Sequence, residues 1–212
     1  MSDYLTLLDW KRTVFELYAE IRAEPRPERA WERWRAVRDR LFTEHPQSPL
    51  DDAQRQDFAG LDLYPYDPAF RTLATVEPAP AHRVAIGASG GESITFARFG
   101  TARFELLGAA QTLDVYWLEG YGGGAFLPFL DWTSSDETYG GGRYLLDTVK
   151  GSDLGEEGGR LVLDFNFAYN PSCSYDGRWV CPLAPTENRL EVAVRAGERR
   201  PHPSGPRTID PV

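Results

Sequence analysis

The feature that most constrains the fold is a series of nine short, strand-like segments that begins near residue 71. Glycine-rich turns separate these segments, including Gly122 to Gly124 and Gly140 to Gly142, and no helical periodicity intervenes. Strands spaced about ten residues apart favour an antiparallel meander, which closes as a barrel or folds over as a sandwich. The predicted strands are residues 71–77, 83–86, 93–99, 102–107, 112–119, 125–130, 143–147, 160–168 and 189–195.

Two amphipathic helices are predicted before the strands. Apolar residues at three- and four-residue spacings over 3–22 predict the first helix, which Pro25 and Pro27 end. The second helix runs over about 28–43 and carries Trp31 and Trp34 on one apolar stripe. Two helices with so short a connection form a hairpin. The tryptophan stripe is interpreted as a packing surface rather than a binding platform.

These patterns predict one structural unit with an α+β, mainly β, fold. Residues 1–44 form the N-terminal helical hairpin, residues 45–70 are a proline-rich connector with one short helix near 51–58, and residues 71–212 form the antiparallel β domain. A chain of 212 residues with 42% hydrophobic residues can bury a core of its own.

The distribution of charge along the chain limits the classes of molecule that this protein is expected to bind. The net charge is −9, while positions 1–44 contain nine basic and nine acidic residues, so the whole acidic excess lies in residues 45–212. An acidic domain of this kind argues against a nucleic-acid partner. No run approaches about 18 apolar residues and the N-terminus does not resemble a signal peptide, so we expect a cytoplasmic protein without a membrane span.

The stretch from Gly87 to Gly91 matches the G-x-S-x-G spacing of a nucleophile elbow around Ser89. That motif requires a helix after the serine. The residues that follow, SITFARF, have the composition of a strand. We therefore interpret the stretch as a hairpin turn.

Cys173 and Cys181 flank an Asp176-Gly177 turn. A two-residue loop places Cys173 opposite Val180, whereas a three-residue loop or a bulge places it opposite Cys181, within reach of a disulfide. Free thiols are the favoured reading for a reducing cytoplasm, with the disulfide kept as an alternative. A zinc site built from both cysteines and a histidine is less favoured, because the three histidines lie far apart in the sequence.

Two polar clusters, one in DWTSSDETYGGGRY at 131–144 and one in the last third of the chain, contain the candidate ligand-binding residues. Two carboxylates in unlike surroundings could divide acid and base roles, and an arginine could grip an anionic substrate. Several acids with neighbouring amides could instead hold Mg²⁺ or Ca²⁺, although no cofactor is evident. The candidates are Asp131, Glu137, Tyr139, Arg143, Asp164, Asn166, Tyr169, Asn170, Glu187 and Asn188.

Long stretches of the chain resemble a bacterial and archaeal family known as domain-of-unknown-function family 1684. The resemblance rests on FLPFLDWTSSDETYGGGRYL, LDFNFAYNPSCSYDGRWVCPLAPTENRL and VRAGE, with WERWRAVRDRLFTEHPQSPL and GLDLYPYDPAFR nearer the N-terminus. The sequence departs from the family at APTENRL, where relatives have a run of prolines. The resemblance implies a single domain that is cytoplasmic or lipid-anchored, and it carries no activity. The matching residues are Phe129, Asp131, Glu137, Tyr139, Gly142, Arg143, Tyr144, Asp164, Asn166, Tyr169, Asn170, Cys173, Cys181, Glu187 and Asn188.

Two functions remain open from the sequence. One is a small-molecule site, binding or catalytic, whose polar residues gather in a pocket. The other is a structural or interaction protein in which Asp131, Glu137 and Arg143 form an ion-pair network that fixes loops. In that second case the helical hairpin could mediate homodimerisation.

Overall fold

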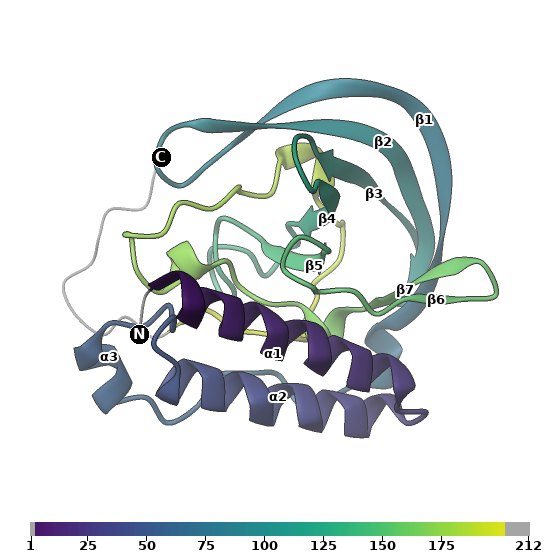
Figure 1. The fold of residues 1–212 in the computed structure, drawn as a ribbon. Helices are drawn as coiled ribbons and strands as arrows, with labels where there is room; N and C mark the ends of the chain where they lie inside the picture. The colour runs from purple at the N-terminus through teal and green to yellow at the C-terminus, as the bar shows by residue number, and fades with distance from the viewer. Residues whose placement is uncertain (1–2, 202–212) are drawn as a thin grey trace.

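The N-terminal helical hairpin is present as predicted. The computed structural model describes residues 3–201, in which α1 (Asp3–Ala23) and α2 (Pro27–Glu44) lie side by side (Figure 1). The short helix of the connector is α3 (Asp52–Gln56), and Asp51 caps its N-terminus by accepting a hydrogen bond from the Gln54 amide. None of the helices in residues 3–201 combines the length and the apolar composition needed to cross a membrane.

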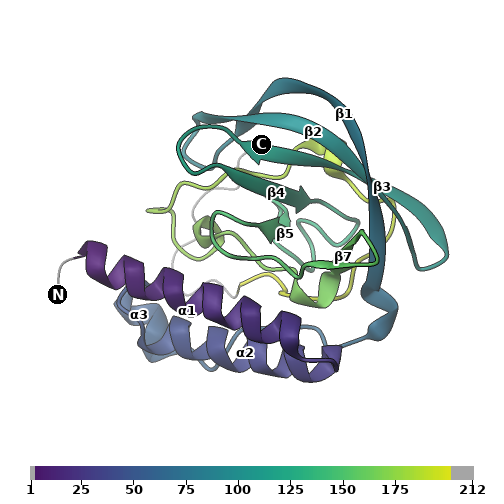
Figure 2. The ribbon, with the colours of Figure 1, turned by 45° about the vertical axis from the view of Figure 1, so that its right-hand side comes forward.

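Seven antiparallel strands form one sheet in the order β5-β4-β3-β2-β1-β7-β6. The predicted meander is confirmed, but the sheet stays open between β5 and β6, so the barrel alternative is wrong for the described residues. Figures 1 and 2 show β1, β2 and β3 arching over the interior while the helical hairpin covers the opposite side. The strands are β1 (Arg71–Gly87), β2 (Ser93–Leu106), β3 (Ala109–Leu118), β4 (Gly124–Phe129), β5 (Arg143–Asp147), β6 (Glu156–Glu157) and β7 (Arg160–Asp164).

Four predicted strands are in fact two long ones. Residues 71–77 and 83–86 belong to β1, which is interrupted by an irregularity between Pro78 and His82. Residues 93–99 and 102–107 belong to β2, so Gly100 is a strand residue and not a turn. A Cβ atom at Gly100 would lie 2.9 Å from the Glu77 carbonyl oxygen of β1. The glycine therefore permits a close backbone approach rather than a reversal of the chain.

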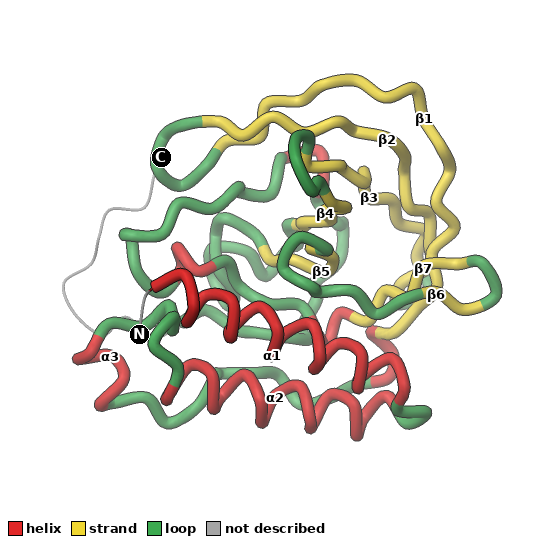
Figure 3. Tube along the Cα trace, viewed as in Figure 1, coloured by secondary structure: helices red, strands yellow, loops and turns green. Residues whose placement is uncertain are grey.

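The last two predicted strands also differ from the structure. The segment 160–168 stays extended only to Asp164, whose side chain then caps a short 3₁₀ helix at Phe165–Phe167. The segment 189–195 is not a strand and pairs through a single bridge between Leu130 and Arg189. Figure 3 shows the chain after β7 mainly as loop. Residues 202–212 of the predicted β domain lie outside the described residues.

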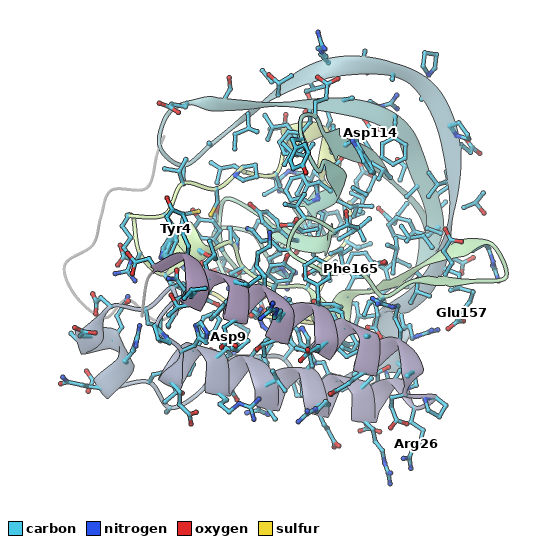
Figure 4. All side chains as sticks on the ribbon, in the orientation of Figure 1. Tyr4, Asp9, Arg26, Asp114, Glu157 and Phe165 are labelled. Carbon is cyan, nitrogen blue, oxygen red and sulfur yellow. The ribbon has the colours of Figure 1, made fainter. Side chains whose placement is uncertain are left out.

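Two apolar clusters make up most of the interior. The first fills the concave side of the sheet around Phe165, which Figure 4 places between the sheet and the helices (Figure 4). The second joins the helical hairpin to the sheet around Trp34, which is fully buried and donates its indole N–H to the Tyr18 hydroxyl at 3.2 Å. Trp31 is also buried and donates to the Asn166 carbonyl oxygen. The tryptophan stripe is thus an internal packing surface.

Candidate functional site

Arg143 and Asp131 form a buried ion pair between the end of β4 and the start of β5. Arg143 Nη2 lies 2.8 Å from Asp131 Oδ2, and each side chain is 1% exposed. The same guanidinium donates hydrogen bonds to the backbone carbonyls of Val194, Ala196 and Glu198. All of these contacts are made within the chain, so the pair fastens a C-terminal segment to the sheet.

Glu137 lies apart from that pair, at the surface. Its Oε1 atom is 2.7 Å from Arg195 Nη2, and its Oε2 atom accepts a hydrogen bond of 2.8 Å from the Tyr64 hydroxyl. The pKa of Glu137 is lowered because Arg195 and Tyr64 both donate to its carboxylate. Glu137 is thus a surface anion with partners of its own, Arg195 and Tyr64, which lie within electrostatic reach of Asp131 and Arg143.

Asp164 and Asn166 form a third, separate arrangement after β7. Asp164 Oδ1 accepts hydrogen bonds from the backbone and side-chain amides of Asn166, and Asn166 Oδ1 accepts one from the Asp67 amide. Asp164 Oδ2 has no hydrogen bond of normal length among the described residues and lies 4.0 Å from Arg71 Nε. Burial raises the pKa of Asp164 to about 6, outweighing Asn166, Arg71 and the Tyr66 phenol, which favour the charged form.

A small hollow lies beside Asp164, near the connection between α1 and α2. Its lining carries both signs of charge, with Arg22 and Arg71 alongside the carboxyl groups of Glu24, Glu157 and Asp164 itself. Arg71 and Glu157 already form an ion pair. The hollow therefore offers an anionic ligand no excess of positive charge.

The predicted pair Glu187 and Asn188 divides between surface and interior. Glu187 is exposed. Asn188 is fully buried, and its Nδ2 donates to the carbonyl oxygens of Asp114 and Pro128 at 2.9 and 2.8 Å. Its Oδ1 accepts from the Asp114 amide at 2.9 Å. With every polar atom of its side chain engaged, Asn188 clamps its loop to β3 and β4.

Tyr169 and Asn170 are the predicted residues that line an open cleft, which we call the aromatic cleft. It lies between α1, α2 and the segment 169–175. Arg38 and Lys150 are the two charged side chains of its lining, and both are positive. The lining residues are Trp10, Val14, Arg38, Phe42, Lys150, Ser152, Tyr169, Asn170, Pro171, Ser172 and Tyr175.

Arg38 is held in the aromatic cleft by aromatic rings and by one carboxylate. Its guanidinium carbon lies 4.9 Å from the centre of the Trp34 ring and 5.0 Å from that of Tyr169. Behind it, the Glu198 carboxylate is 1% exposed and pairs with the guanidinium. Burial disfavours the charged form of Arg38, but the Glu198 carboxylate together with Tyr175 and Tyr18 outweighs burial and raises the pKa of Arg38. Arg38 is therefore a permanent cation on the cleft wall.

Cys173 and Cys181 come together next to Tyr139. Both cysteines are free thiols; Cys181 is buried and Cys173 is partly exposed. The Tyr139 hydroxyl lies 3.7 Å from the Cys173 sulfur, and the Cys181 thiol hydrogen bonds with Cys173. The favoured sequence reading, two neighbouring free thiols, agrees with this structure. Ser89, in the turn between β1 and β2, joins them by accepting a hydrogen bond from the Cys181 amide.

The ten candidate residues thus do not meet in one pocket. Within residues 3–201, no group of three or more His, Cys, Asp or Glu side chains could hold a metal ion. The acids proposed for a divalent cation do not gather into one group, and neither His45 nor His82 joins the two cysteines in such a group. The candidates divide into structural anchors, one member of a surface ion pair, two residues of the aromatic cleft, one neighbour of the thiol pair and the exposed Glu187.

Sequence reasoning missed Arg38, Lys150 and Glu198. Arg38 is one of many arginines and nothing in its local pattern sets it apart. Lys150 did carry a signal, because it is one of two lysines among 23 basic residues. Glu198 lies 160 positions from its partner Arg38, and a single sequence does not reveal a pairing at that separation.

Comparison with known proteins identifies the family of this chain. The family model "Protein of unknown function (DUF1684)" matches residues 56–199. The chain belongs to this family. A solution NMR structure of an uncharacterized protein from Haloarcula marismortui is 36% identical, covers 79% of this chain and 91% of that chain, and superposes with a TM-score of 0.58. No curated protein matches the chain.

The DUF1684 match defines which parts of the site belong to the family region. Cys173, Cys181, Tyr139, Lys150 and the segment 169–175 fall within it. Arg38 and the other helical residues of the aromatic cleft come from the hairpin, outside the matched residues. The thiol pair is thus built within the DUF1684 region, and the aromatic cleft is shared between that region and the N-terminal helices.

Proposed function

We propose that this protein binds a small aromatic or partly apolar organic anion in the aromatic cleft. The observation that carries the proposal is the charge of the cleft lining, which includes Arg38 and Lys150 and no carboxylate. The chain as a whole has a net charge of −9, so a lining with only positive charge is the exception on this molecule. Local positive charge in an acidic protein attracts and orients anions.

The shape and composition of the cleft support a compact ligand. Its accessible volume is about 70 Å³, which is room for a few water-sized groups rather than for a nucleotide. Trp10, Phe42, Tyr169 and Tyr175 supply ring faces against which an apolar or aromatic group can pack. Asn170 adds a buried amide oxygen that has no hydrogen-bond partner among the described residues, and such an atom favours a bound donor.

Lys150 is the group best placed to contact the ligand. Its side chain is 50% exposed, and its Nζ atom lies 3.6 Å from Asp147 and 5.6 Å above the centre of the Tyr144 ring. Because half of this side chain is in solvent, its ammonium can turn toward an anion at the mouth of the cleft, at the cost of its contact with the buried Asp147 carboxylate. Arg38, by contrast, is already paired with Glu198 and acts as a fixed charge on the wall.

The chemistry of the lining supports binding rather than catalysis. Burial raises the pKa values of Tyr169 and Tyr175 well above the ordinary range, so both phenols stay protonated near neutral pH. No histidine, carboxylate or cysteine occurs among the described residues of the lining. The cleft thus holds hydrogen-bond donors and lacks an evident general base.

A titration with matched ligands tests this proposal. Benzoate, 4-hydroxybenzoate and phenyl phosphate are added to the whole chain, with benzamide as the uncharged counterpart of benzoate, and binding is followed by NMR and thermal unfolding. We expect the anions to bind and benzamide to bind more weakly. At about 100 times its Kd, a ligand adds about 2.7 kcal/mol to the free energy of unfolding.

The two lysines provide a matched pair of variants. Lys150→Gln removes the charge at the mouth and should weaken anion binding about tenfold. Lys11→Gln makes the same change on the exposed surface of α1 and should leave the affinity unchanged. Equal binding of benzoate and benzamide, no binding by any of the three anions, or equal effects of the two substitutions would overturn the proposal.

A further inference from the structure

We propose that Cys173 and Cys181 form a dithiol that hydrogen peroxide oxidises, with Cys173 reacting first and Cys181 then closing a disulfide. The site does not depend on a ligand in the aromatic cleft. The two thiols lie close together, differ in exposure, are surrounded by hydrogen-bond donors and belong to two separately anchored chain segments.

The two sulfur atoms are close enough to share a proton. The Cys181 thiol hydrogen bonds to Cys173, and this contact is the largest of the interactions that lower the pKa of Cys173. The hydroxyls of Ser89 and Tyr139 contribute further in the same direction. The hydrogen bond with Cys173 and, after it, burial raise the pKa of Cys181. The negative charge of the pair is therefore located on Cys173.

Exposure gives the two thiols different roles. Cys173 is partly exposed, so a small oxidant can reach it, whereas Cys181 is 4% exposed. Thiolates react with peroxide and thiols scarcely do so. The accessible sulfur is thus also the one that carries the charge, and the buried sulfur lies next to it as the resolving thiol.

The segments that carry the cysteines are anchored independently. The Cys181 carbonyl accepts a hydrogen bond of 3.0 Å from the Ser89 amide, which fixes that sulfur against the turn between β1 and β2. Cys173 lies in the 3₁₀ helix Ser172–Ser174, whose end is tied by a hydrogen bond from the Tyr175 amide to the Ser172 carbonyl. The sheet and the loop therefore hold the two sulfur atoms close together in the reduced protein.

The chemistry balances with one peroxide molecule. The Cys173 thiolate attacks one peroxide oxygen, so that an S–O bond forms and the O–O bond breaks, and the departing hydroxide takes up the proton that Cys173 released. The Cys181 sulfur then attacks the sulfenic acid sulfur. An S–S bond forms, the S–O bond breaks, and the hydroxide leaves with the Cys181 proton as a second water. Two thiols and one hydrogen peroxide give one disulfide and two waters.

The wild-type chain tests the overall reaction, because it contains only these two cysteines. The protein is treated with hydrogen peroxide, unfolded and exposed to N-ethylmaleimide, and its intact mass is measured. We expect monomers that accept no maleimide and that accept two after treatment with dithiothreitol. Thiols that both remain alkylatable, or a disulfide that links two chains, would overturn the proposal.

Single substitutions test the order of the steps. Cys181→Ser should stop at a sulfenic acid on Cys173 that dimedone traps. Cys173→Ser should slow the oxidation of Cys181 by at least about tenfold, because the remaining thiol is buried and protonated. Rapid oxidation of Cys181 in the Cys173→Ser variant would reverse the assignment and overturn the proposal.

Tyr139→Phe gives a readout that does not require loss of either cysteine. The titratable groups around the pair are Tyr139, Tyr144 and each cysteine for the other, with Lys150 acting on Cys181. Removing the Tyr139 hydroxyl should shift the pH midpoint of Cys173 alkylation by iodoacetamide upward. Tyr121→Phe, at a fully exposed tyrosine, should leave the midpoint unchanged. Identical midpoints in both variants and the wild type would show that the Tyr139 hydroxyl does not support the thiolate, contrary to the proposal.

Discussion

Arg143 donates to the Asp131 carboxylate across 2.8 Å in a part of the protein where both side chains are 1% exposed. The pair begins and nearly ends the stretch DWTSSDETYGGGRY, so its two members are close in sequence, but the other contacts of the Arg143 guanidinium reach residues more than fifty positions away. This stretch of the family signature therefore has a structural role at Asp131 and Arg143.

The first prediction concerns the stability that this pair contributes. Arg143→Met should lower the free energy of unfolding by about 3 to 5 kcal/mol, because it leaves a buried carboxylate without its cation. It also removes the donor to three backbone carbonyls. Urea denaturation followed by tryptophan fluorescence measures the change. Glu137→Gln, which breaks the neighbouring surface pair with Arg195, serves as the control and should have a far smaller effect. Equal losses in the two variants would contradict the structural role.

The second prediction concerns pH and follows from the raised pKa of Asp164. The folded-state pKa is about 6, whereas an unfolded aspartate titrates near 3.9. Between these values the folded state binds the extra proton. The stability contributed by Asp164 is therefore complete below about pH 4 and is lost as the pH rises through 6.

Asp164→Asn isolates this effect. The variant keeps an oxygen to accept from the Asn166 amides but cannot ionise. Relative to the wild type, it should gain on the order of 2 to 3 kcal/mol in unfolding free energy between pH 4 and pH 7. The comparison is needed because burial also raises the pKa of Asp147, which acts in the same direction. Asp136→Asn, at an exposed position, should retain the pH dependence of the wild type, and a pH-independent difference for Asp164→Asn would refute the assignment.

The third prediction concerns the last of the three consecutive glycines. Gly142 has φ +86°, and a Cβ atom there would lie 2.7 Å from the Phe129 carbonyl oxygen and closer still to the Ala184 Cβ. Gly108 has a similar φ of +77° with nothing within 4 Å of the added atom. Gly108→Ala should therefore cost about 1 kcal/mol from the backbone conformation alone. Gly142→Ala should cost at least about 2 kcal/mol more, because of the steric clash. Matching urea midpoints for the two variants would show that the close approach is absent.

Local periodicity was sufficient to predict the helices and the meander. Helical spacing and two prolines located the hairpin to within a few residues, since those signals are contained in the segments themselves. The prediction of strand boundaries failed at residues whose structural role differs from the role that their type and position indicate. Gly100 reads as a turn residue but allows two strands to approach, and Asp164 reads as a strand residue but caps a 3₁₀ helix.

The candidate site was harder to predict from the sequence than the fold was. The segments around Tyr169 and Cys173 were correctly singled out as polar and irregular. Their chemistry, however, depends on partners that the fold supplies from elsewhere, such as Arg38 on α2 and Ser89 in the first strand turn. Buried amides such as Asn188 were indistinguishable from ligand-binding ones, because both uses require the same donors and acceptors.

The pairing of Arg38 with Glu198 has a consequence for folding during synthesis on the ribosome. The two residues are 160 positions apart, and a ribosome adds about 5 to 20 residues per second. Roughly 8 to 32 seconds therefore pass between the synthesis of Arg38 and the synthesis of Glu198, whose carboxylate pairs with the Arg38 guanidinium. During that interval the apolar face of the hairpin has no finished sheet to cover it, so we expect the hairpin to dock only after the residues of the sheet have been made.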